Sequence, residues 1–431
     1  MKLFLALLCG LMLAATACGC GQSGKEANTI EVWHWMTDRQ DAFEVLARKY
    51  EAQTGIKVKL ALFAPSDAYT QKIIAAAQAN ILPDVYSILD KKAIVAAFIK
   101  AGFVADLTDA FQMDNNAWEK SLFTKAVDVN RFVEGNVDGV KPGIYGVPID
   151  VGSQQLLYNK TLLRQAGITR PPATFEEWLA DIDVLRRAGI TPFVSGFGEL
   201  WLIDCFASNY AFNIMGEQKV FDTFRGKVSY TDPDWLRVFT IFKTLHDRGA
   251  FMNGIVTKGN KLAEQDFAVF ERAAFTFNGA WSVHVYRQMR PDLDYGVVPL
   301  PVFNPALPMV SWGGAETSLV VNNLSPDKDK AIAFLKWLTA REQQVFLFTH
   351  LYSLPVNREA MAGVPENLAA FSRVMETSTH PKVWPVNEDP LVSEAFLKGI
   401  QAIIIGEKTP QAVARDVQLV KDRQIEKASQ P

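Results

Sequence analysis

Between residues 30 and 89 the sequence alternates strand patterns with helix patterns, and this alternation limits the fold more than any other feature. The expected strands cover residues 30–33, 56–62 and 85–89, and the expected helices cover 37–55 and 66–79. The first helix carries Phe43, Leu46, Ala47 and Tyr50 at positions i, i+3, i+4 and i+7, and its start has a capping-box pattern, Thr37 with Gln40. Strands that alternate with helices favour parallel α/β layering.

The same pattern continues later in the chain without a fixed repeat length. A second capping box, Thr174 with Glu177, predicts a helix start, and Ser325-Pro326 predicts another. Strand patterns cover residues 272–277, 295–298 and 318–321. No low-complexity linker divides the chain, so we expect two lobes that share strands and are connected more than once.

Composition indicates a large folded protein. The 431 residues correspond to two or three domains if about 150 residues make one domain. Hydrophobic residues make up 49% and charged residues 21%, which is a globular mixture that can bury a large core. The net charge is −3 and no run of like charges forms a basic stripe, so nucleic acid is not expected as a partner.

The N-terminus has the pattern of an export signal. Residues 1–17 combine Lys2 with an apolar stretch that is too short to span a bilayer, which takes about 20 residues. Small residues at 14–17 stand directly before Cys18, which resembles the bacterial lipobox, in which the cysteine is lipidated. Ala15 replaces the usual leucine and Cys20 is a competing cysteine, so ordinary signal cleavage stays an alternative. Residues 18–28 would then form a lipid-anchored tether.

The folded part of the chain shows no recognisable catalytic or metal-binding motif. Cys205 is the one cysteine beyond the tether, so a disulfide framework and a paired-cysteine metal site are excluded, and we expect a small buried hydrophobic residue there. The five histidines lack metal-ligand spacing, and the nucleophile elbow, the Walker A loop and the zinc-protease motif are missing. We therefore predict no cofactor and no metal. A catalytic carboxylate pair depends on distance in space, which the sequence does not give.

Aromatic residues give the strongest functional signal. The chain has 10 Trp, 10 Tyr and 28 Phe, and several tryptophans stand beside polar residues at predicted strand ends or turns. These places are Trp33-His34-Trp35, Trp201, Asn278-Gly279-Ala280-Trp281, Ser311-Trp312-Gly313-Gly314 and Trp384. Each tryptophan could equally pack in a core, but a sugar ring needs flat apolar faces with polar neighbours, so together they indicate a sugar-binding cleft.

From residue 30 to the C-terminus the sequence resembles family 1 of the extracellular solute-binding proteins of ABC importers, the group that includes maltose-binding and other sugar-binding proteins. The segments that carry this resemblance are 30–33, 49–51, 54–58, 83–85, 145–148, 157–160 with Leu163 and Gly167, 172–178, 274–281, 295–301, and Ser325-Pro326 before Ala331, Phe334 and Leu335. The order and spacing of these segments are more specific than any one of them.

The resemblance implies an α/β fold of the class II periplasmic-binding-protein type, in which two lobes are joined by a multi-crossing hinge and the ligand binds in the cleft between them. The N-terminal lobe would comprise residues 29–149 and 314–355, and the C-terminal lobe residues 150–313 and 356–431. The hinge crossings are expected near 147–151, 308–314 and 354–357.

The resemblance also implies a set of ligand-facing residues. The loop after the first strand places His34, Trp35 and Asp38 at the cleft, although His34 could instead make a structural turn contact. Asp90 matches a position that offers a carboxylate to sugar hydroxyls, and Asp150 lies at the first hinge crossing. The remaining candidates are Trp201, Trp281, Trp312 and Trp384 as aromatic contacts, and Gly313 and Gly314 as places of close backbone approach.

The expected function is that of the extracytoplasmic substrate-binding component of an ABC importer, which is not an enzyme. It would bind a sugar or oligosaccharide and deliver it to a transmembrane permease that works with an ATPase subunit. We expect a monomer, exported and lipid-anchored at Cys18, in the periplasm or at the outer face of the cytoplasmic membrane. The same fold could instead bind a polyol or a glycerophosphodiester, with Arg39 as a nearby cation, or the chain could be a secreted glycosidase.

Overall fold

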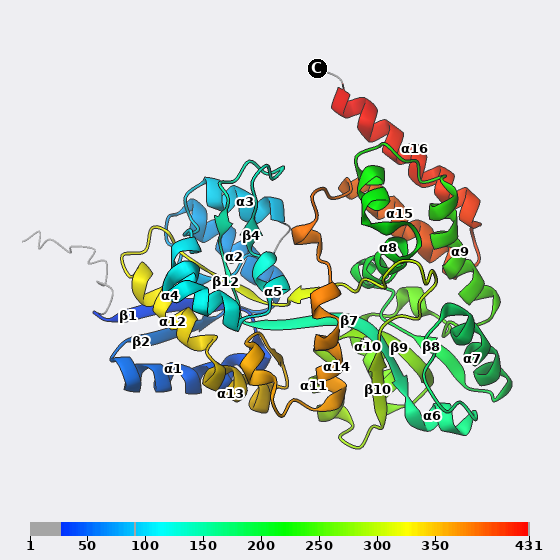
Figure 1. The fold of residues 1–431 in the computed structure, drawn as a ribbon, viewed down its shortest axis with the longest axis horizontal. Coiled ribbons are helices and arrows are strands. Elements are labelled where there is room, and N and C mark those ends of the chain that lie inside the picture. The colour runs from blue at the N-terminus through cyan, green and yellow to red at the C-terminus, as the bar shows by residue number, and fades with distance from the viewer. Residues whose placement is uncertain (1–26, 90–91, 430–431) are drawn as a thin grey trace, which may run out of the picture.

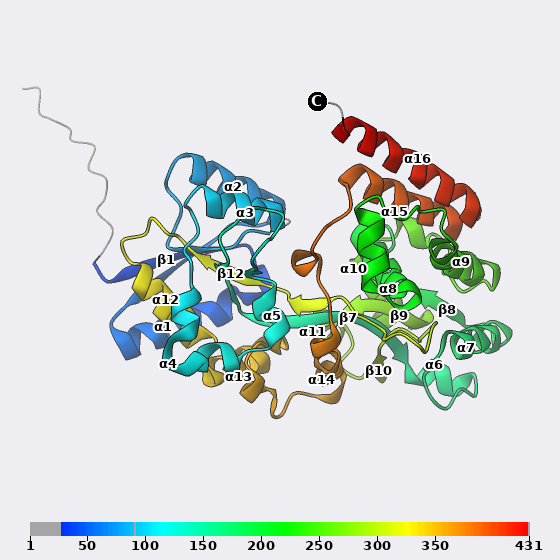
Figure 2. The same ribbon diagram turned by 45° about the horizontal axis from the view of Figure 1, so that its top comes forward.

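Two lobes lie side by side in the protein, and one long strand runs from the junction into the second lobe (Figures 1 and 2). The structure is a computed structural model that describes residues 27–89 and 92–429. The strand at the junction is β7 (Asp150–Asn159). The mixed sheets and the two-lobe architecture confirm the predicted fold class.

The first lobe is built on a five-stranded sheet with the order β2-β1-β3-β12-β6. β1 pairs in parallel with β2 and β3, whereas β12 pairs antiparallel to β3 and β6. The bounds are β1 Thr29–His34, β2 Lys57–Leu62, β3 Val85–Tyr86, β6 Val147–Pro148 and β12 Ser318–Val321. A smaller hairpin pairs β4 (Arg131–Phe132) with β5 (Gly143–Ile144).

Helices cover both faces of this sheet, whose inner strands β1 and β3 carry apolar side chains on both sides. One face packs against α1, α12 and α13, and the other against α2 and α3, with Tyr69 and Tyr86 fully buried between them. The bounds are α1 Gln40–Thr54, α2 Ser66–Gln78, α3 Lys92–Lys100, α4 Thr108–Ser121, α5 Thr124–Asp128, α12 Lys328–Leu338 and α13 Arg341–Leu351.

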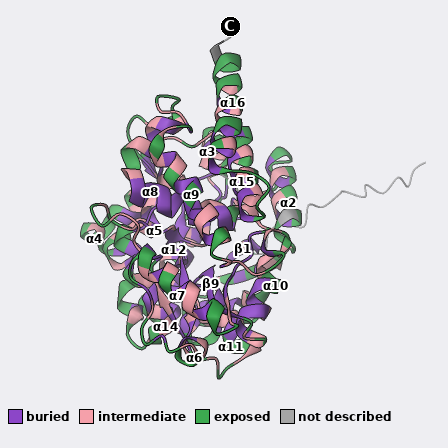
Figure 3. Ribbon diagram, turned by 90° about the vertical axis from the view of Figure 1, so that its right-hand side faces the viewer, coloured by how far each residue is buried: buried purple, intermediate pink, exposed green. Residues whose placement is uncertain are grey.

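The second lobe has its own sheet with the order β10-β7-β9-β8. β9 (Ala273–Gly279) is its most buried strand, since all seven residues are inside the lobe (Figure 3). It pairs antiparallel with β7 and in parallel with β8 (Thr191–Val194), and β10 (Tyr295–Val298) pairs with the outer half of β7. A fully buried strand of this kind reads as a continuous apolar run, as residues 273–277 do.

Helices surround the second sheet, and the two C-terminal helices pack on α8 and α9. Cys205 lies in α8 with no exposed surface, which confirms the predicted buried hydrophobic role. The bounds are α6 Lys160–Gln165, α7 Phe175–Arg187, α8 Leu200–Phe224, α9 Pro233–Asp247, α10 Asn260–Glu264, α11 Ser282–Met289, α14 Glu366–Arg373, α15 Pro390–Ile404 and α16 Pro410–Ser429.

The chain passes between the lobes at β7. It leaves the first sheet after β6 and enters β7 at Asp150, and it returns between β11 (Gly313–Ala315), which pairs with β7, and β12. A further connection follows α13, where β13 (Leu354–Pro355) pairs with the first residues of β7. α14 then packs against β7 and β10. The exact lobe boundaries given above stay a prediction.

Local signals in the sequence had mixed outcomes. The capping box at Thr174 forms, with its side chain accepting the backbone N–H of Glu177. The one predicted at Thr37 is wrong: residues Thr37–Arg39 form a 3₁₀ turn and α1 begins at Gln40 without a side-chain cap. α12 begins at Lys328 rather than at Ser325. The Ser325 hydroxyl accepts the backbone N–H of Asp327 at 2.9 Å and donates to Asp84.

Within residues 27–89 and 92–429, every helix is too short or too polar to cross a membrane.

Candidate functional site

A pocket of about 520 Å³ lies between the two lobes, and we call it the interlobe pocket. The first lobe contributes the start of α1, the second lobe contributes α11, and the hinge contributes Glu316 and the end of α13. The lining residues are Asp38, Arg39, Asp41, Ala42, Val45, Ala280, Trp281, His284, Val285, Gln288, Glu316, His350, Leu351, Tyr352, Ser353 and Leu354. Two predicted site residues, Asp38 and Trp281, are therefore part of one pocket.

Trp281 is positioned by the turn between β9 and α11. Its indole ring lies directly over Gly279, where a Cβ atom would overlap the ring, so the glycine provides the space that the ring occupies. The ring centroid lies 5.6 Å from that of Trp201, at an interplanar angle of 57°. Trp201, at the start of α8, is 40% exposed. The two predicted aromatic contacts thus form a pair in which neither ring is fully buried.

Polar groups of the second lobe hold this aromatic pair from behind. The Trp201 indole N–H donates to Glu199 Oε2 at 2.8 Å, and Glu199 Oε1 accepts the backbone N–H of Asn260 at 2.6 Å. Asn260 Nδ2 donates to Glu264 Oε1 at 3.0 Å, and Asn278 Nδ2 donates to the same oxygen at 3.0 Å. Burial raises the pKa of Glu264, while hydrogen bonds from Asn278, Trp281 and Asn260 oppose that shift.

An ion pair connects the first-lobe loop with the hinge. Arg39 Nη2 lies 2.5 Å from Asp150 Oδ2, and Asp150 Oδ1 accepts the backbone N–H of Thr317 at 2.7 Å. Asp150 is 1% exposed. Both of its oxygens therefore have partners inside the hinge, and a contact of Asp150 with a ligand stays a prediction.

Glu316, beside β11 at the hinge, has one carboxylate oxygen without a hydrogen-bond partner among the described residues. Its carboxylate lies over Gly152, where a Cβ atom would overlap it, and its Oε1 has no hydrogen bond among the described residues. Burial and then the nearby Asp150 raise the pKa of Glu316 well above its ordinary value, and Arg39 opposes this. Burial lowers the pKa of His284 across the pocket. Within residues 27–89 and 92–429, no group of His, Cys, Asp and Glu side chains is arranged to hold a metal ion.

His34 and Trp35 lie inside the first lobe beside the pocket. His34 has no exposed surface, and neither ring nitrogen makes a hydrogen bond of ordinary geometry with a described residue. Burial lowers its pKa, and the neighbouring side chains of Gln40 and Asp38 oppose the shift. Trp35 is half-buried, with its ring 5.3 Å from that of Tyr69. Their contact with a ligand stays a prediction.

Trp312 and Trp384 pack on each other in the second lobe. Their ring centroids are 5.7 Å apart at 82°, and the Trp384 indole N–H donates to Thr379 Oγ1 at 2.7 Å. Trp384 also contacts Phe212 and is 9% exposed, so it serves as core packing here rather than as an open stacking surface. Trp312 is half-buried, and its indole nitrogen has no partner among the described residues.

Gly313 and Gly314 permit close approach, but the neighbours are the protein's own atoms. A Cβ on Gly313 would lie 3.0 Å from the side chains of Ser153 and Ser378, and Gly314 has a φ of +137° with Val129 beside it. The space beside both glycines is thus filled by the hinge. Their role as places where a ligand approaches the backbone stays a prediction. Asp90 and Cys18, the two remaining candidates, lie outside the described residues.

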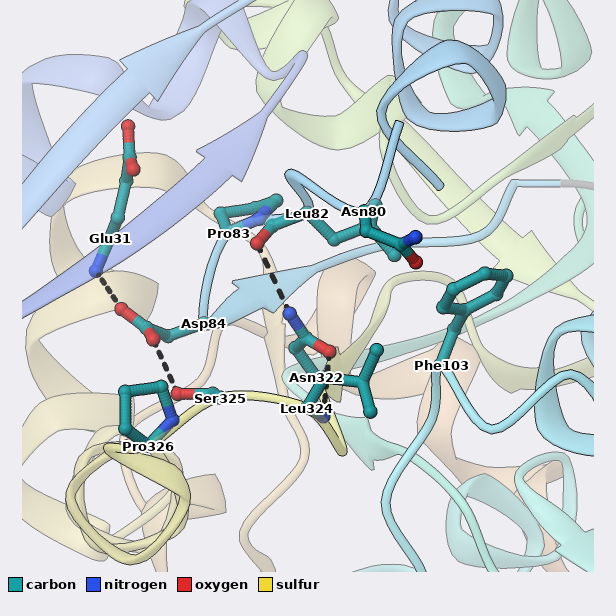
Figure 4. A pocket seen from close by; sticks show the side chains of 10 residues that line it. All are labelled: Glu31, Asn80, Leu82, Pro83, Asp84, Phe103, Asn322, Leu324, Ser325 and Pro326. Atoms are coloured by element: carbon teal, nitrogen blue, oxygen red, sulfur yellow. Dashed lines mark hydrogen bonds between the residues drawn. The ribbon is translucent and has the colours of Figure 1, made fainter. Parts of the chain in front are cut away.

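A second pocket, which we call the outer pocket, occupies about 240 Å³ on the first lobe (Figure 4). It lies where β1 and β3 begin, at the opposite end of these strands from the interlobe pocket. Its polar groups bond to one another: Asp84 accepts the Glu31 backbone N–H at 2.7 Å and the Ser325 hydroxyl at 2.5 Å, and Asn322 donates to the Leu82 carbonyl at 3.1 Å. Ligands of open α/β sheets bind at the carboxyl ends of the strands, which favours the interlobe pocket.

Sequence reasoning missed Glu199, Glu264, Asn260 and Glu316. Glu199 stands two residues before Trp201, and this was the one local signal available. Asn260 stands 61 residues after Glu199, and Glu316 stands 164 residues after Gly152, so no spacing rule relates these pairs. Arg39 was considered only as a cation for a phosphate, whereas the structure pairs it with Asp150.

Comparison with known proteins identifies a matching family profile, similar sequences and similar solved structures. A profile described as bacterial extracellular solute-binding protein matches residues 34–345. A multiple sugar-binding protein of Streptococcus mutans is 20% identical, over 87% of this chain and 86% of its own length. A melibiose/raffinose/stachyose-binding protein of Bacillus subtilis is 22% identical, over 82% of this chain and 79% of its own length. The solved structure of a chitin oligosaccharide binding protein is 20% identical with a TM-score of 0.73, covering 92% of this chain and 98% of that one.

Proposed function

Because this chain belongs to the bacterial extracellular solute-binding protein family, we propose that it captures a sugar or oligosaccharide between its lobes and delivers it to the permease of an ABC importer. The observation that carries the proposal is the interlobe pocket, in which the Trp281 ring lies beside polar side chains and has the Trp201 ring next to it, 5.6 Å away. The names of the two relatives and of the similar structure, all binders of sugars or oligosaccharides, support it.

The chemistry of the pocket fits a neutral polyhydroxylated ring. Indole faces attract the C–H face of a pyranose, while the hydroxyls take hydrogen bonds from charged groups, which are about twice as strong as neutral ones. Asp38, whose side chain is 57% exposed, is available as an acceptor. Because the two walls belong to different lobes, bending at β7 would close them over the ligand.

The alternative ligands fit less well. A glycerophosphodiester needs an uncommitted cation, whereas the Arg39 guanidinium is held by Asp150, and Asp38 and Asp41 add negative charge to the pocket. A polyol has no flat ring face, so it would gain little from the indole pair.

Members of this family are binding proteins, and we propose that this chain likewise performs no chemical step. A secreted glycosidase would need two carboxyl groups facing one glycosidic bond. A bound oligosaccharide recovered at its original length supports a binding protein, and a shortened one supports the glycosidase.

We also propose that the protein is exported, cleaved before Cys18 and anchored by a lipid on that cysteine, so that residues 18–28 tether a monomer to the outer face of the cytoplasmic membrane or in the periplasm. Mass spectrometry of the mature N-terminus tests this. Cys18→Ala should release the protein from the membrane fraction, whereas Cys20→Ala should leave it there. Release by Cys20→Ala alone would move the anchor to Cys20.

The function is tested by titrating the exported, processed protein with mono- and oligosaccharides, polyols and glycerophosphodiesters, and following tryptophan fluorescence and melting temperature. Saturable sugar binding that is weakened by Trp281→Leu supports the proposal. Trp337→Leu is the matched control, because Trp337 packs on Tyr50 in the first lobe, outside the residues that line the interlobe pocket. A response to the phosphodiester alone would keep the fold and change the ligand.

A further inference from the structure

The structure points to Glu199 and Glu264 as positioning residues that fix the angle between the Trp201 and Trp281 rings and so shape this pair to a sugar ring. We propose that the two carboxylates act through the indoles rather than on the ligand itself. The inference rests on the proposed function as far as the sugar is concerned, but the positioning itself can be measured without any ligand.

The Trp201 ring is held by a hydrogen bond rather than by close packing. Trp201 is 40% exposed, so few neighbours restrict the rotation of its ring. Its indole N–H donates to Glu199 Oε2 at 2.8 Å, and the other oxygen, Glu199 Oε1, accepts the backbone N–H of Asn260 at 2.6 Å. The carboxylate thus ties an exposed indole to the start of α10. Hydrogen bonds to an ionised acceptor are the strong ones, which suits this task.

On the other side, Glu264 is buried at 5% exposure behind Trp281. Its Oε1 accepts hydrogen bonds from the Nδ2 groups of Asn260 and Asn278, each at 3.0 Å, and the nearby Trp281 side chain opposes the rise in the pKa of this carboxyl that burial causes. Asn278 belongs to the end of β9, the most buried strand of the lobe. Through Asn278, Glu264 connects the surroundings of the Trp281 ring to the second sheet.

Asn260 joins the two halves. Its backbone N–H donates to Glu199 and its side chain donates to Glu264. A continuous hydrogen-bonded chain therefore runs from the Trp201 indole through Glu199 and Asn260 to Glu264. Gly196 allows this, because a Cβ there would collide with the Asn260 backbone. All of these residues lie in the second lobe. The angle of 57° between the rings is consequently set before the lobes close, which reduces the ordering cost of binding.

The test begins with the ligand-free full chain. Two indoles this close couple electronically and give paired circular dichroism bands of opposite sign in the far ultraviolet, and Trp201→Phe identifies the contribution of this pair. Glu199→Ala and Glu264→Ala should at least halve these bands. Glu199→Gln, which keeps an acceptor oxygen, should retain most of the signal. Glu217→Ala, an exposed carboxylate on the same helix α8, is the matched control and should change nothing.

Sugar binding is measured on the same variants with maltotriose, raffinose and chitobiose as probes. Glu199→Ala should weaken binding about tenfold, and Glu199→Gln should remain within about twofold of the unaltered protein. Paired bands in Glu199→Ala as strong as those in Glu217→Ala would overturn the proposal. Bands that persist in Trp201→Phe come from other pairs, such as Trp312 with Trp384, and are subtracted before the comparison. If Glu264→Ala does not fold, the partly exposed Glu199 decides the question alone. If no probe binds the unaltered protein, the proposed ligand fails while the dichroism still decides the positioning role.

Discussion

The interlobe pocket and the outer pocket both combine carboxylates with apolar walls, yet their polar groups are used differently. In the outer pocket, both oxygens of Asp84 accept hydrogen bonds and the Asn322 side chain both donates and accepts (Figure 4). In the interlobe pocket, Glu316 keeps an oxygen without a partner among the described residues, and Asp38 is more than half exposed. Paired polar groups stabilise a fold, whereas buried groups left unpaired cost free energy that a ligand can recover.

The largest expected effect is a loss of stability when the Arg39–Asp150 ion pair is broken. It tests whether residues of the interlobe pocket also stabilise the fold. Arg39→Met leaves Asp150 buried without its cation, so we expect a loss of about 3–5 kcal/mol in the free energy of unfolding. Urea denaturation measures it. The double variant Arg39→Met/Asp150→Asn should recover part of the loss. A change below about 1 kcal/mol would mean that the ion pair contributes little to the hinge.

The second prediction concerns the outer pocket. Asp84→Ala removes the acceptor of the Glu31 backbone N–H and of the Ser325 hydroxyl, so we expect a loss of about 2–3 kcal/mol in stability. Sugar affinity of the folded fraction should remain unchanged, because the site lies at the opposite end of β1. A tenfold loss of sugar affinity at unchanged stability would reverse the roles of the two pockets.

The third prediction is the opposite: sugar affinity falls strongly while the free energy of unfolding changes little. Trp281→Leu removes a ring face from the interlobe pocket, so we expect sugar affinity to fall about 10- to 100-fold, which corresponds to about 1–3 kcal/mol. The unfolding free energy should change by less than about 1 kcal/mol, because the ring is only half-buried. Isothermal calorimetry and urea denaturation on the same preparation separate the two quantities. Equal losses in both would identify Trp281 as a core residue.

The smallest expected effect is a pH dependence at His284. Burial lowers the pKa of His284 below its ordinary value, with Asp38 opposing this and Arg39 and Arg287 adding to it. The unfolded chain therefore binds this proton first, so the stability contributed by neutral His284 is present above pH 6.5 and falls as the pH drops below that value. His284→Asn should show a shallower loss of stability on acidification than the unaltered protein. Identical slopes would contradict the shift.

Much of the fold could be predicted because its signals are local. The strands 295–298 and 318–321 appear with the predicted bounds, and Gly55 ends α1 in the left-handed conformation that glycine favours. Thr37 shows the limit of such signals: a capping pattern was present, but the chain turns through a 3₁₀ segment that brings Arg39 toward Asp150. A buried ion pair outweighs one side-chain cap, which is worth about 1 kcal/mol.

The candidate site was less predictable, because its parts meet only after folding. Trp281 could be recognised from the Asn-Gly-Ala-Trp turn that positions it. The assignment of Trp384 rested on residue type and missed its neighbours Phe212 and Thr379, which occupy the ring and its N–H. Glu316 stands 164 residues after Gly152, the residue that makes room for it, so no window of sequence contains both.

The position of β12 has a consequence for the order in which the parts of the protein can fold. This strand lies between β3 and β6 in the first sheet, although it is separated from them by the 169 residues between Pro148 and Ser318 that build most of the second lobe. Until residue 321 is available, the first sheet lacks an inner strand and β6 has no partner in it. Contacts between such distant segments form slowly, because a long loop must close before they are gained. The amino-terminal third of the chain therefore cannot complete its sheet alone, and a ribosome-bound or membrane-threaded fragment ending before β12 would remain open to proteases and chaperones.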